Sequence, residues 1–241
     1  NELGLDIKDL YLIENMKISE MFDSIQGEGP NAGEPAIFIR LALCNLTCSW
    51  CDTKYTWDWD NYDFDKEVHH FEIEDIIKKI QTYKIKHIVI TGGEPLMQQE
   101  ELIKLLSPLK NNYFIEVETN CTIIPNELLM KIVDQWNVSP KTKNSGNLPE
   151  QYENKESYDF FTDVDNCYFK FVVENEEDLT EIQKLINKYN IKKDSVFLMP
   201  QATTKREIIS REEIVSKLAK NHKFRYSPRM HVSMWGNQRG K

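Results

Sequence analysis

The chain has 241 residues, of which 40% are hydrophobic, and its 30 basic and 39 acidic side chains give a formal net charge of −9. This balance indicates a globular protein with a full core, and it excludes a broad nucleic-acid surface, which would need clustered Lys and Arg. No apolar run approaches the roughly 18 residues that cross a bilayer, and the N-terminus lacks a signal-peptide pattern, so we expect a cytoplasmic protein with no membrane partner.

The first fifteen residues, "NELGLDIKDLYLIEN", precede Met16. We interpret residues 1–15 as an N-terminal extension, either native or foreign to the protein, and we expect residues 16–241 to form a single domain. A polar, Gly-rich stretch, "SIQGEGPNAGEP", then precedes the first predicted strand of the sheet.

From residue 36 onward, short β-rich runs alternate with helical patterns. The predicted strands are 36–43, 87–91, 113–119, 167–173 and 195–200, and the predicted helices are 72–84, 102–109, 176–189 and 210–220. This alternation predicts an α/β fold with a mainly parallel sheet, and the chain is short for a closed eight-fold barrel, so we expect a partial, open β/α barrel. The polar segment 141–156 is predicted to be a loop or insertion.

Three cysteines, Cys44, Cys48 and Cys51, follow the first predicted strand with the spacing C-x3-C-x2-C in "CNLTCSWC". Three thiolates can hold three irons of a 4Fe–4S cluster and leave the fourth iron open for chemistry. Two alternatives remain: a zinc site completed by Cys121 or Cys167, and three incidental core thiols. We interpret Cys121 and Cys167 as small buried hydrophobic residues.

Further unusual segments follow later strands: "TGGEP" at 91–95, "ETNC" at 118–121, "SPK" at 139–141 and "PQ" at 200–201. Loops at the carboxyl ends of parallel strands meet at one edge of a sheet, so we expect these segments to converge on the cysteine loop. Two adjacent glycines allow the backbone to approach a ligand closely. A tight turn between strand and helix would explain them equally well.

"CNLTCSWC" and "TGGEP" resemble the motifs of the radical S-adenosylmethionine superfamily. The resemblance implies that the open iron binds the methionine part of S-adenosylmethionine, and that an electron from the cluster releases a 5′-deoxyadenosyl radical, so no side chain is itself the radical source. It also implies that Trp50 lies near the adenine and that Glu118 and Asn120 contact the ribose, although Trp50 could simply pack. The full set of implied nucleotide contacts is Trp50, Asp52, Gly92, Gly93, Glu94, Glu118, Asn120, Ser139, Pro140, Lys141 and Gln201.

"SIQGEG", "CSWCDT" and "WGNQRG" narrow the resemblance to the 7-carboxy-7-deazaguanine synthase family of queuosine biosynthesis, over most of residues 16–241. That family is a group of lyases that convert 6-carboxy-5,6,7,8-tetrahydropterin to 7-carboxy-7-deazaguanine with loss of ammonia, using Mg²⁺. The resemblance implies pterin contacts from Ile25, Gln26, Gly27, Glu28, Arg40, Thr91, His231 and Lys241.

Among these pterin contacts, Arg40 would meet the substrate carboxylate. The resemblance also implies that the hydroxyl of Thr53, which is not one of them, would ligate Mg²⁺. A structural salt bridge for Arg40, helix N-capping for Thr53 and core packing for His231 remain the alternatives. The family resemblance also implies a flavodoxin or ferredoxin reductant and a homodimer. "WDWD" at 57–60 is interpreted as a surface loop or an interface element.

Two other classes of function stay open. An activating enzyme for a glycyl-radical protein would share the cysteine spacing, but it would need a groove for a protein and would not need "SIQGEG" or Thr53. A non-enzymatic zinc or iron–sulfur module would need a fourth protein ligand.

Overall fold

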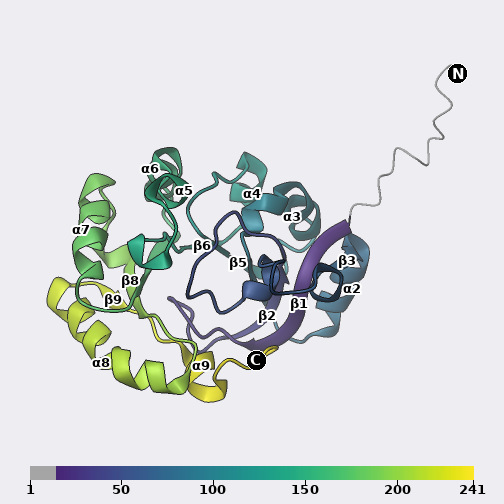
Figure 1. The fold of residues 1–241 in the computed structure, drawn as a ribbon. Helices are drawn as coiled ribbons and strands as arrows, with labels where there is room; N and C mark the ends of the chain where they lie inside the picture. The colour runs from purple at the N-terminus through teal and green to yellow at the C-terminus, as the bar shows by residue number, and fades with distance from the viewer. Residues whose placement is uncertain (1–14) are drawn as a thin grey trace, which may run out of the picture.

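The computed structural model describes residues 15–241, which form one sheet of nine strands in the order β3-β1-β2-β4-β5-β6-β7-β8-β9 (Figure 1). The strands are β1 (Asn15–Ile25), β2 (Pro35–Leu41), β3 (His69–Glu72), β4 (His87–Gly92), β5 (Phe114–Thr119), β6 (Gln135–Val138), β7 (Cys167–Val173), β8 (Val196–Pro200) and β9 (Arg225–Tyr226). In the order of the sheet, β2 and the six strands that follow it, β4 to β9, are parallel to one another. Strand β1 runs antiparallel to both of its neighbours, β2 and β3. The prediction of an open, mainly parallel α/β barrel is confirmed.

Strand β1 was missing from the prediction, which began the sheet at residue 36. Met16 and Ile18 are fully buried, but the other face of β1 is only partly covered, so its hydrophobic pattern is weak. An antiparallel strand with one solvated face lacks the continuous apolar run of the inner parallel strands. Residues 1–14 of the predicted extension lie outside the described residues, and Asn15 already pairs with Glu72 as the first residue of β1.

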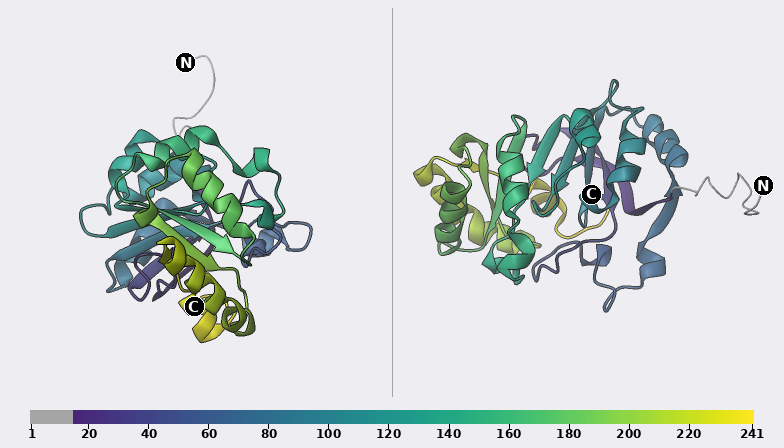
Figure 2. Two further views of the ribbon diagram at one scale, coloured as in Figure 1. Left: turned by 90° about the vertical axis from the view of Figure 1, so that its left-hand side faces the viewer. Right: turned by 90° about the horizontal axis from the view of Figure 1, so that it is seen from above.

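Helices cover the outer face of the curved sheet (Figures 1 and 2). The described residues contain the helices α1 (Phe64–Glu67), α2 (Ile73–Thr82), α3 (Gln99–Leu106), α4 (Glu127–Ile132), α5 (Pro149–Tyr152), α6 (Lys155–Thr162), α7 (Asp178–Lys188), α8 (Lys205–His222) and α9 (Met230–Trp235). The four predicted helices correspond to α2, α3, α7 and α8, whose buried apolar side chains recur every three or four residues. Segment 141–156, predicted to be a loop, contains α5 and the start of α6.

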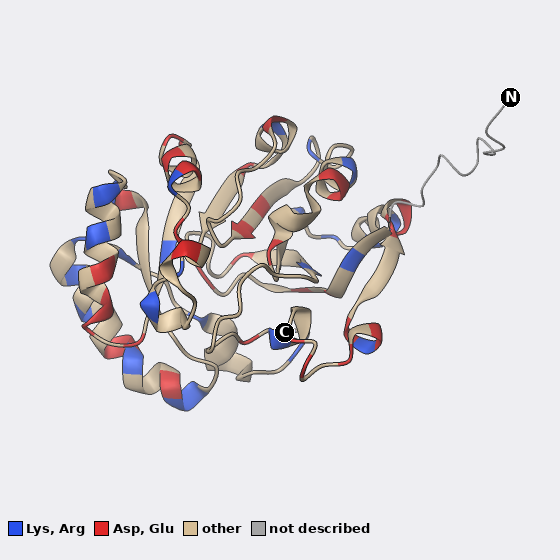
Figure 3. Ribbon diagram, turned by 45° about the horizontal axis from the view of Figure 1, so that its top comes forward, with Lys and Arg blue, Asp and Glu red and all other residues tan. Residues whose placement is uncertain are grey.

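The outward surfaces of these helices are mixed in charge. Both acidic and basic side chains occur along α7 and α8 (Figure 3). Within residues 15–241, none of the helices combines the length and the apolar character that a membrane span requires.

The register of the sheet places polar side chains of neighbouring strands next to one another. Arg40 on β2 is paired with Thr91 on β4, and the Thr91 hydroxyl donates a 2.7 Å hydrogen bond to Glu118 on β5. Arg40, Thr91 and Glu118 therefore form a row across three neighbouring strands, at their carboxyl ends.

Candidate active site

One cleft lies at the carboxyl ends of the parallel strands. Together with its open mouth it encloses about 1250 Å³ of empty space. Every residue predicted above for the cluster, the nucleotide, Mg²⁺ or the pterin lines this cleft, with two exceptions, Glu94 and Pro140. The loops that follow the strands therefore converge on one cleft, as expected from the sequence.

The three clustered cysteines line one part of the cleft, and Leu46 and Tyr152 pack beside them. Cys121 and Cys167 instead belong to the main hydrophobic core, where burial raises the pKa of both thiols. Among residues 15–241, no group of three or more His, Cys, Asp or Glu side chains is arranged to hold a single metal ion. Neither Cys121 nor Cys167, one of which the zinc alternative needs as its fourth ligand, lines the cleft with the other three cysteines.

The two glycines of "TGGEP" are explained by the approach of another part of the backbone. A Cβ on Gly93 would lie 1.9 Å from the Leu43 carbonyl oxygen, and one on Gly92 would lie 2.2 Å from that of Leu41. The loop after β4 therefore packs directly on the end of β2, and both glycines still line the cleft.

Glu94 is fully buried and does not line the cleft. Its carboxylate accepts hydrogen bonds from Leu96 N at 2.9 Å, Thr119 Oγ1 at 2.8 Å and Asn120 N at 2.7 Å. Glu94 thus joins the loop after β4 to the loop after β5. In this arrangement it positions the predicted ribose ligand Asn120, and the predicted contact of Glu94 with the nucleotide stays a prediction.

Glu118 lies among the residues predicted for the pterin. Besides Thr91, its carboxylate accepts a 3.3 Å hydrogen bond from Gln26 Nε2, and Lys170 Nζ lies 3.7 Å away. The predicted ribose role of Glu118 is therefore less well supported by the geometry than a role on the pterin side. The Gln26 amide is itself held by Glu116, a buried carboxylate beneath the cleft.

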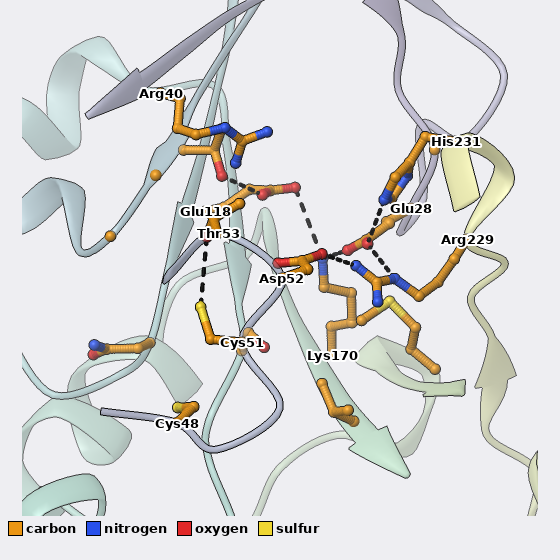
Figure 4. A pocket seen from close by; sticks show the side chains of 18 of the residues that line it. Glu28, Arg40, Cys48, Cys51, Asp52, Thr53, Glu118, Lys170, Arg229 and His231 are labelled. Carbon is orange, nitrogen blue, oxygen red and sulfur yellow. Dashed lines mark hydrogen bonds and ion pairs between the residues drawn. The ribbon is translucent and has the colours of Figure 1, made fainter. Parts of the chain in front are cut away.

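A buried network of charges lies on one side of the cleft, and Cys48 and Cys51 lie on the other (Figure 4). Glu28 accepts hydrogen bonds from Lys170 Nζ and, at 2.9 Å, from Arg229 Nε, and a second nitrogen of Arg229 donates to Asp52. Burial alone would raise the pKa of Glu28, but Lys170 and Arg229 hold it well below its usual range. The carboxylate is therefore ionised and ready to accept further hydrogen bonds.

Lys170 and Arg229 were not predicted as site residues. Burial opposes a charged ammonium, yet Glu118 and Glu28 raise the pKa of Lys170 above its usual value, so it stays protonated. The sequence does contain a signal for Lys170, which lies in the middle of the apolar run "CYFKFVV". A buried Lys is costly unless it is paired, so a Lys in a buried strand indicates a nearby acidic partner. No comparable signal marks Arg229 in "YSPRM".

Arg40 makes the structural salt bridge that was one of its two expected roles, and its role as a ligand of the substrate carboxylate stays a prediction. Its Nε donates a 2.9 Å hydrogen bond to Glu20, and its side chain also lines the cleft. Glu20 in addition accepts hydrogen bonds from Tyr55 and from Arg239 of the C-terminal segment. Since Arg40 has five N–H donors, the pairing with Glu20 leaves others for a ligand.

Thr53 lies at the N-cap position of the 3-10 turn Lys54–Thr56, but its side chain makes no capping hydrogen bond. The capping alternative therefore does not account for its hydroxyl, which lies 3.5 Å from Cys51 Sγ. Thr53 and Asp52 both line the cleft, so they offer oxygen atoms beside the cysteine loop.

Four predicted nucleotide contacts line the cleft from three loops. The Trp50 indole nitrogen donates a 2.9 Å hydrogen bond to the Asn144 carbonyl, and the Lys141 ammonium lies 5.9 Å from the Trp50 ring centre. Lys141 also donates to the Ser139 carbonyl at 2.6 Å, and the Gln201 carbonyl accepts a hydrogen bond from Arg211. Trp50 is thus packed and hydrogen-bonded while it still faces the cleft.

His231 lies over Gly27, where a Cβ would come within 2.4 Å of the imidazole Nδ1, so only glycine leaves room for it. Burial is the main cause that lowers the pKa of His231 from 6.5 to about 4. The imidazole is therefore neutral at pH 7, 3.8 Å from a Glu28 oxygen.

The lowered pKa of His231 predicts a loss of stability in mild acid. Between pH 6.5 and pH 4 the unfolded chain binds a proton at this residue and the folded protein does not. The free energy of unfolding therefore falls as the pH drops through this window, by up to about 3 kcal/mol. Chemical denaturation at a series of pH values measures this slope. His231→Gln should flatten it, and His69→Gln, at an exposed position of β3, should not; equal slopes in all three proteins would refute the assignment.

Comparisons with known proteins agree with this geometry. The family model of the Radical SAM superfamily matches residues 39–142. The 7-carboxy-7-deazaguanine synthase of Pyrobaculum aerophilum is 37% identical over 227 residues, which cover 94% of this chain and 97% of that protein. That of Halobacterium salinarum is 32% identical, over 92% of this chain and 91% of that protein.

Solved structures show the same fold. The crystal structure of QueE from Escherichia coli has a TM-score of 0.66 at 26% identity, over 92% of this chain and 98% of that chain. SuiB of Streptococcus suis, at 14% identity and a TM-score of 0.53, covers 76% of this chain and shares the fold alone. On its sequence, its fold and the residues of its cleft, the chain belongs to the 7-carboxy-7-deazaguanine synthase family of the radical SAM superfamily.

Proposed function

We propose that the protein converts 6-carboxy-5,6,7,8-tetrahydropterin to 7-carboxy-7-deazaguanine with loss of ammonia, as a radical SAM lyase. The observation that carries this proposal is the single cleft in which a three-cysteine loop faces the ionised carboxylate of Glu28, the Glu118 side chain and the cation Arg40. These groups complement the two ends of a carboxypterin, whose ring carries N–H donors and whose substituent is an anion.

Cys44, Cys48 and Cys51 would hold a 4Fe–4S cluster, and the loops after β4, β5, β6 and β8 would hold S-adenosylmethionine. When bound, these two groups supply the radical that removes hydrogen from the substrate. The protein's own residues orient the pterin: Glu28 and Glu118 accept hydrogen bonds from its ring, and Arg40 binds its carboxylate.

The neighbours of Glu28 keep it in one protonation state. Lys170 and Arg229 keep Glu28 ionised, so it can act only as an acceptor. Neutral His231 packs over Gly27 and covers one side of the pocket, with the C-terminal segment up to Lys241 lining it as well. A covered pocket keeps water from the reacting carbon.

Mg²⁺, the reductant and the assembly are further parts of the proposal. The Thr53 hydroxyl, free of a capping role, is proposed as a magnesium ligand, with water and substrate oxygens as the other ligands. Flavodoxin or ferredoxin is the proposed electron donor, and residues 16–241 are proposed to act as one domain in a cytoplasmic homodimer. These features are supported by the membership of the family.

The proposal is tested by anaerobic incubation of the reconstituted protein with dithionite, S-adenosylmethionine, Mg²⁺ and carboxytetrahydropterin. A product with the mass of 7-carboxy-7-deazaguanine is expected, and omission of Mg²⁺ should slow its formation. Deuterium placed on carbon 6 of the pterin should pass to 5′-deoxyadenosine. A protein with a full cluster that makes no 7-deazapurine, or that consumes the nucleotide on a protein substrate, would contradict the proposal.

A further inference from the structure

Each of the three clustered cysteine sulfurs accepts one N–H hydrogen bond. The donors are the Leu46 backbone to Cys44 at 3.5 Å, Asn147 Nδ2 to Cys48 at 3.3 Å and Trp57 Nε1 to Cys51 at 3.4 Å. The two side-chain donors are Trp57 in "WDWD" and Asn147 in segment 141–156, and neither residue has a role in the proposed function so far.

The orientation of the Asn147 amide is fixed by its other contacts. Its Oδ1 accepts a 2.9 Å hydrogen bond from the backbone N–H of Thr47, which can only donate. The amide nitrogen must therefore face Cys48, and it also lies 3.1 Å from Ser145 Oγ. Asn147 is only 6% exposed, so water does not compete for this donor.

The segment that carries Asn147 is bound along the cysteine loop at further points. The Ser49 backbone N–H donates to the Ser145 carbonyl at 2.9 Å, and Trp50 Nε1 donates to the Asn144 carbonyl at the same distance. The buried Tyr152 of α5 packs with Cys48. Asn147 is therefore held against the thiol by hydrogen bonds to the two carbonyls on its N-terminal side and by the packing of Tyr152 on its C-terminal side.

We propose that Asn147 and Trp57 are positioning residues that set the reduction potential of the cluster through N–H hydrogen bonds to the Cys48 and Cys51 thiolates. This inference rests on the proposed function, which supplies the cluster. An N–H dipole directed at a sulfur stabilises the more negative, reduced cluster more than the oxidised one, so each donor raises the reduction potential. The two donors thereby ease the delivery of the first electron.

The test is a redox titration of the reconstituted protein, followed by electron paramagnetic resonance, with and without S-adenosylmethionine. Asn147→Leu and Trp57→Phe each remove one donor while keeping a similar shape. Each is expected to lower the equilibrium constant for one-electron reduction by about tenfold, which moves the midpoint potential about 59 mV more negative. The double variant should show roughly the sum of the two shifts, because the donors act on different sulfurs.

The matched control is Thr47→Val. It removes the 3.3 Å hydrogen bond from the Thr47 hydroxyl to Asn147 Oδ1 but no donor to sulfur, and the backbone bond that orients the amide remains. Its midpoint potential should equal that of the unsubstituted protein. Resonance Raman bands of the iron–thiolate bonds should shift in the donor variants and not in the control.

Midpoint potentials unchanged in both donor variants, with four irons still present, would overturn the proposal. If Asn147→Leu fails to hold a cluster, Trp57→Phe decides alone, and an unchanged potential there overturns it equally. A third outcome separates the two proposals. If the unsubstituted protein assembles the cluster but forms no 7-deazapurine, while the donor variants show the expected shifts in midpoint potential, the proposed function is refuted and the effect of the two donors on the potential is confirmed.

Discussion

Replacing Cys48 with alanine is expected to abolish the four-iron cluster and, with it, all turnover. Cys48 is 6% exposed and packs beside the other two cysteines of the loop, so its loss removes one of three iron ligands that no neighbouring side chain can replace. Iron and labile sulfide are measured after anaerobic reconstitution, and product is measured by mass. The expected result is fewer than four irons per chain and no detectable product.

The matched control is the Cys121→Ala, Cys167→Ala double variant. Both residues lie in the main hydrophobic core, away from the cleft, so the variant should keep its iron and sulfide and lose only some stability. Loss of iron from this variant as complete as from Cys48→Ala would show that a core cysteine is a ligand, and our assignment of the open iron would be wrong.

Replacing Lys170 with methionine is expected to have the second largest effect. The change leaves the buried carboxylate of Glu28 and the partly buried one of Glu118 without their shared cation, and breaking a buried ion pair from one side costs about 3–5 kcal/mol. The surplus negative charge also opposes the binding of an anionic substrate. We expect a lower free energy of unfolding in denaturant titrations and a KM for the pterin raised by about tenfold or more.

Lys188→Met is the control for this change. Lys188 pairs with Glu153 on the surface, where an exposed ion pair contributes about 0–1 kcal/mol, so its stability and KM should stay close to those of the unsubstituted protein. If Lys170→Met behaves like Lys188→Met in both measurements, Lys170 neither balances the carboxylates nor shapes the substrate site.

The sequence by itself determined the features that depend on short-range spacing. The cysteines lie within eight residues of one another, so one loop can bring them together in almost any fold. The helical periodicity of α2 and α7 and the apolar runs of the inner strands predicted the alternation of strands and helices. Parallel strands place their carboxyl ends at one edge, and this rule placed "TGGEP" and "ETNC" beside the cysteine loop.

Only the tertiary structure decided which distant groups meet. Lys170 and Arg229 reach Glu28 across 142 and 201 residues, and Asn147 reaches Cys48 across 99. Such pairings depend on strand register and on the path of each loop, which no local pattern encodes. The same holds for Glu94, which is buried because the loop after β4 packs on the end of β2, and for Glu118, which the register of β5 places among the residues proposed to bind the pterin.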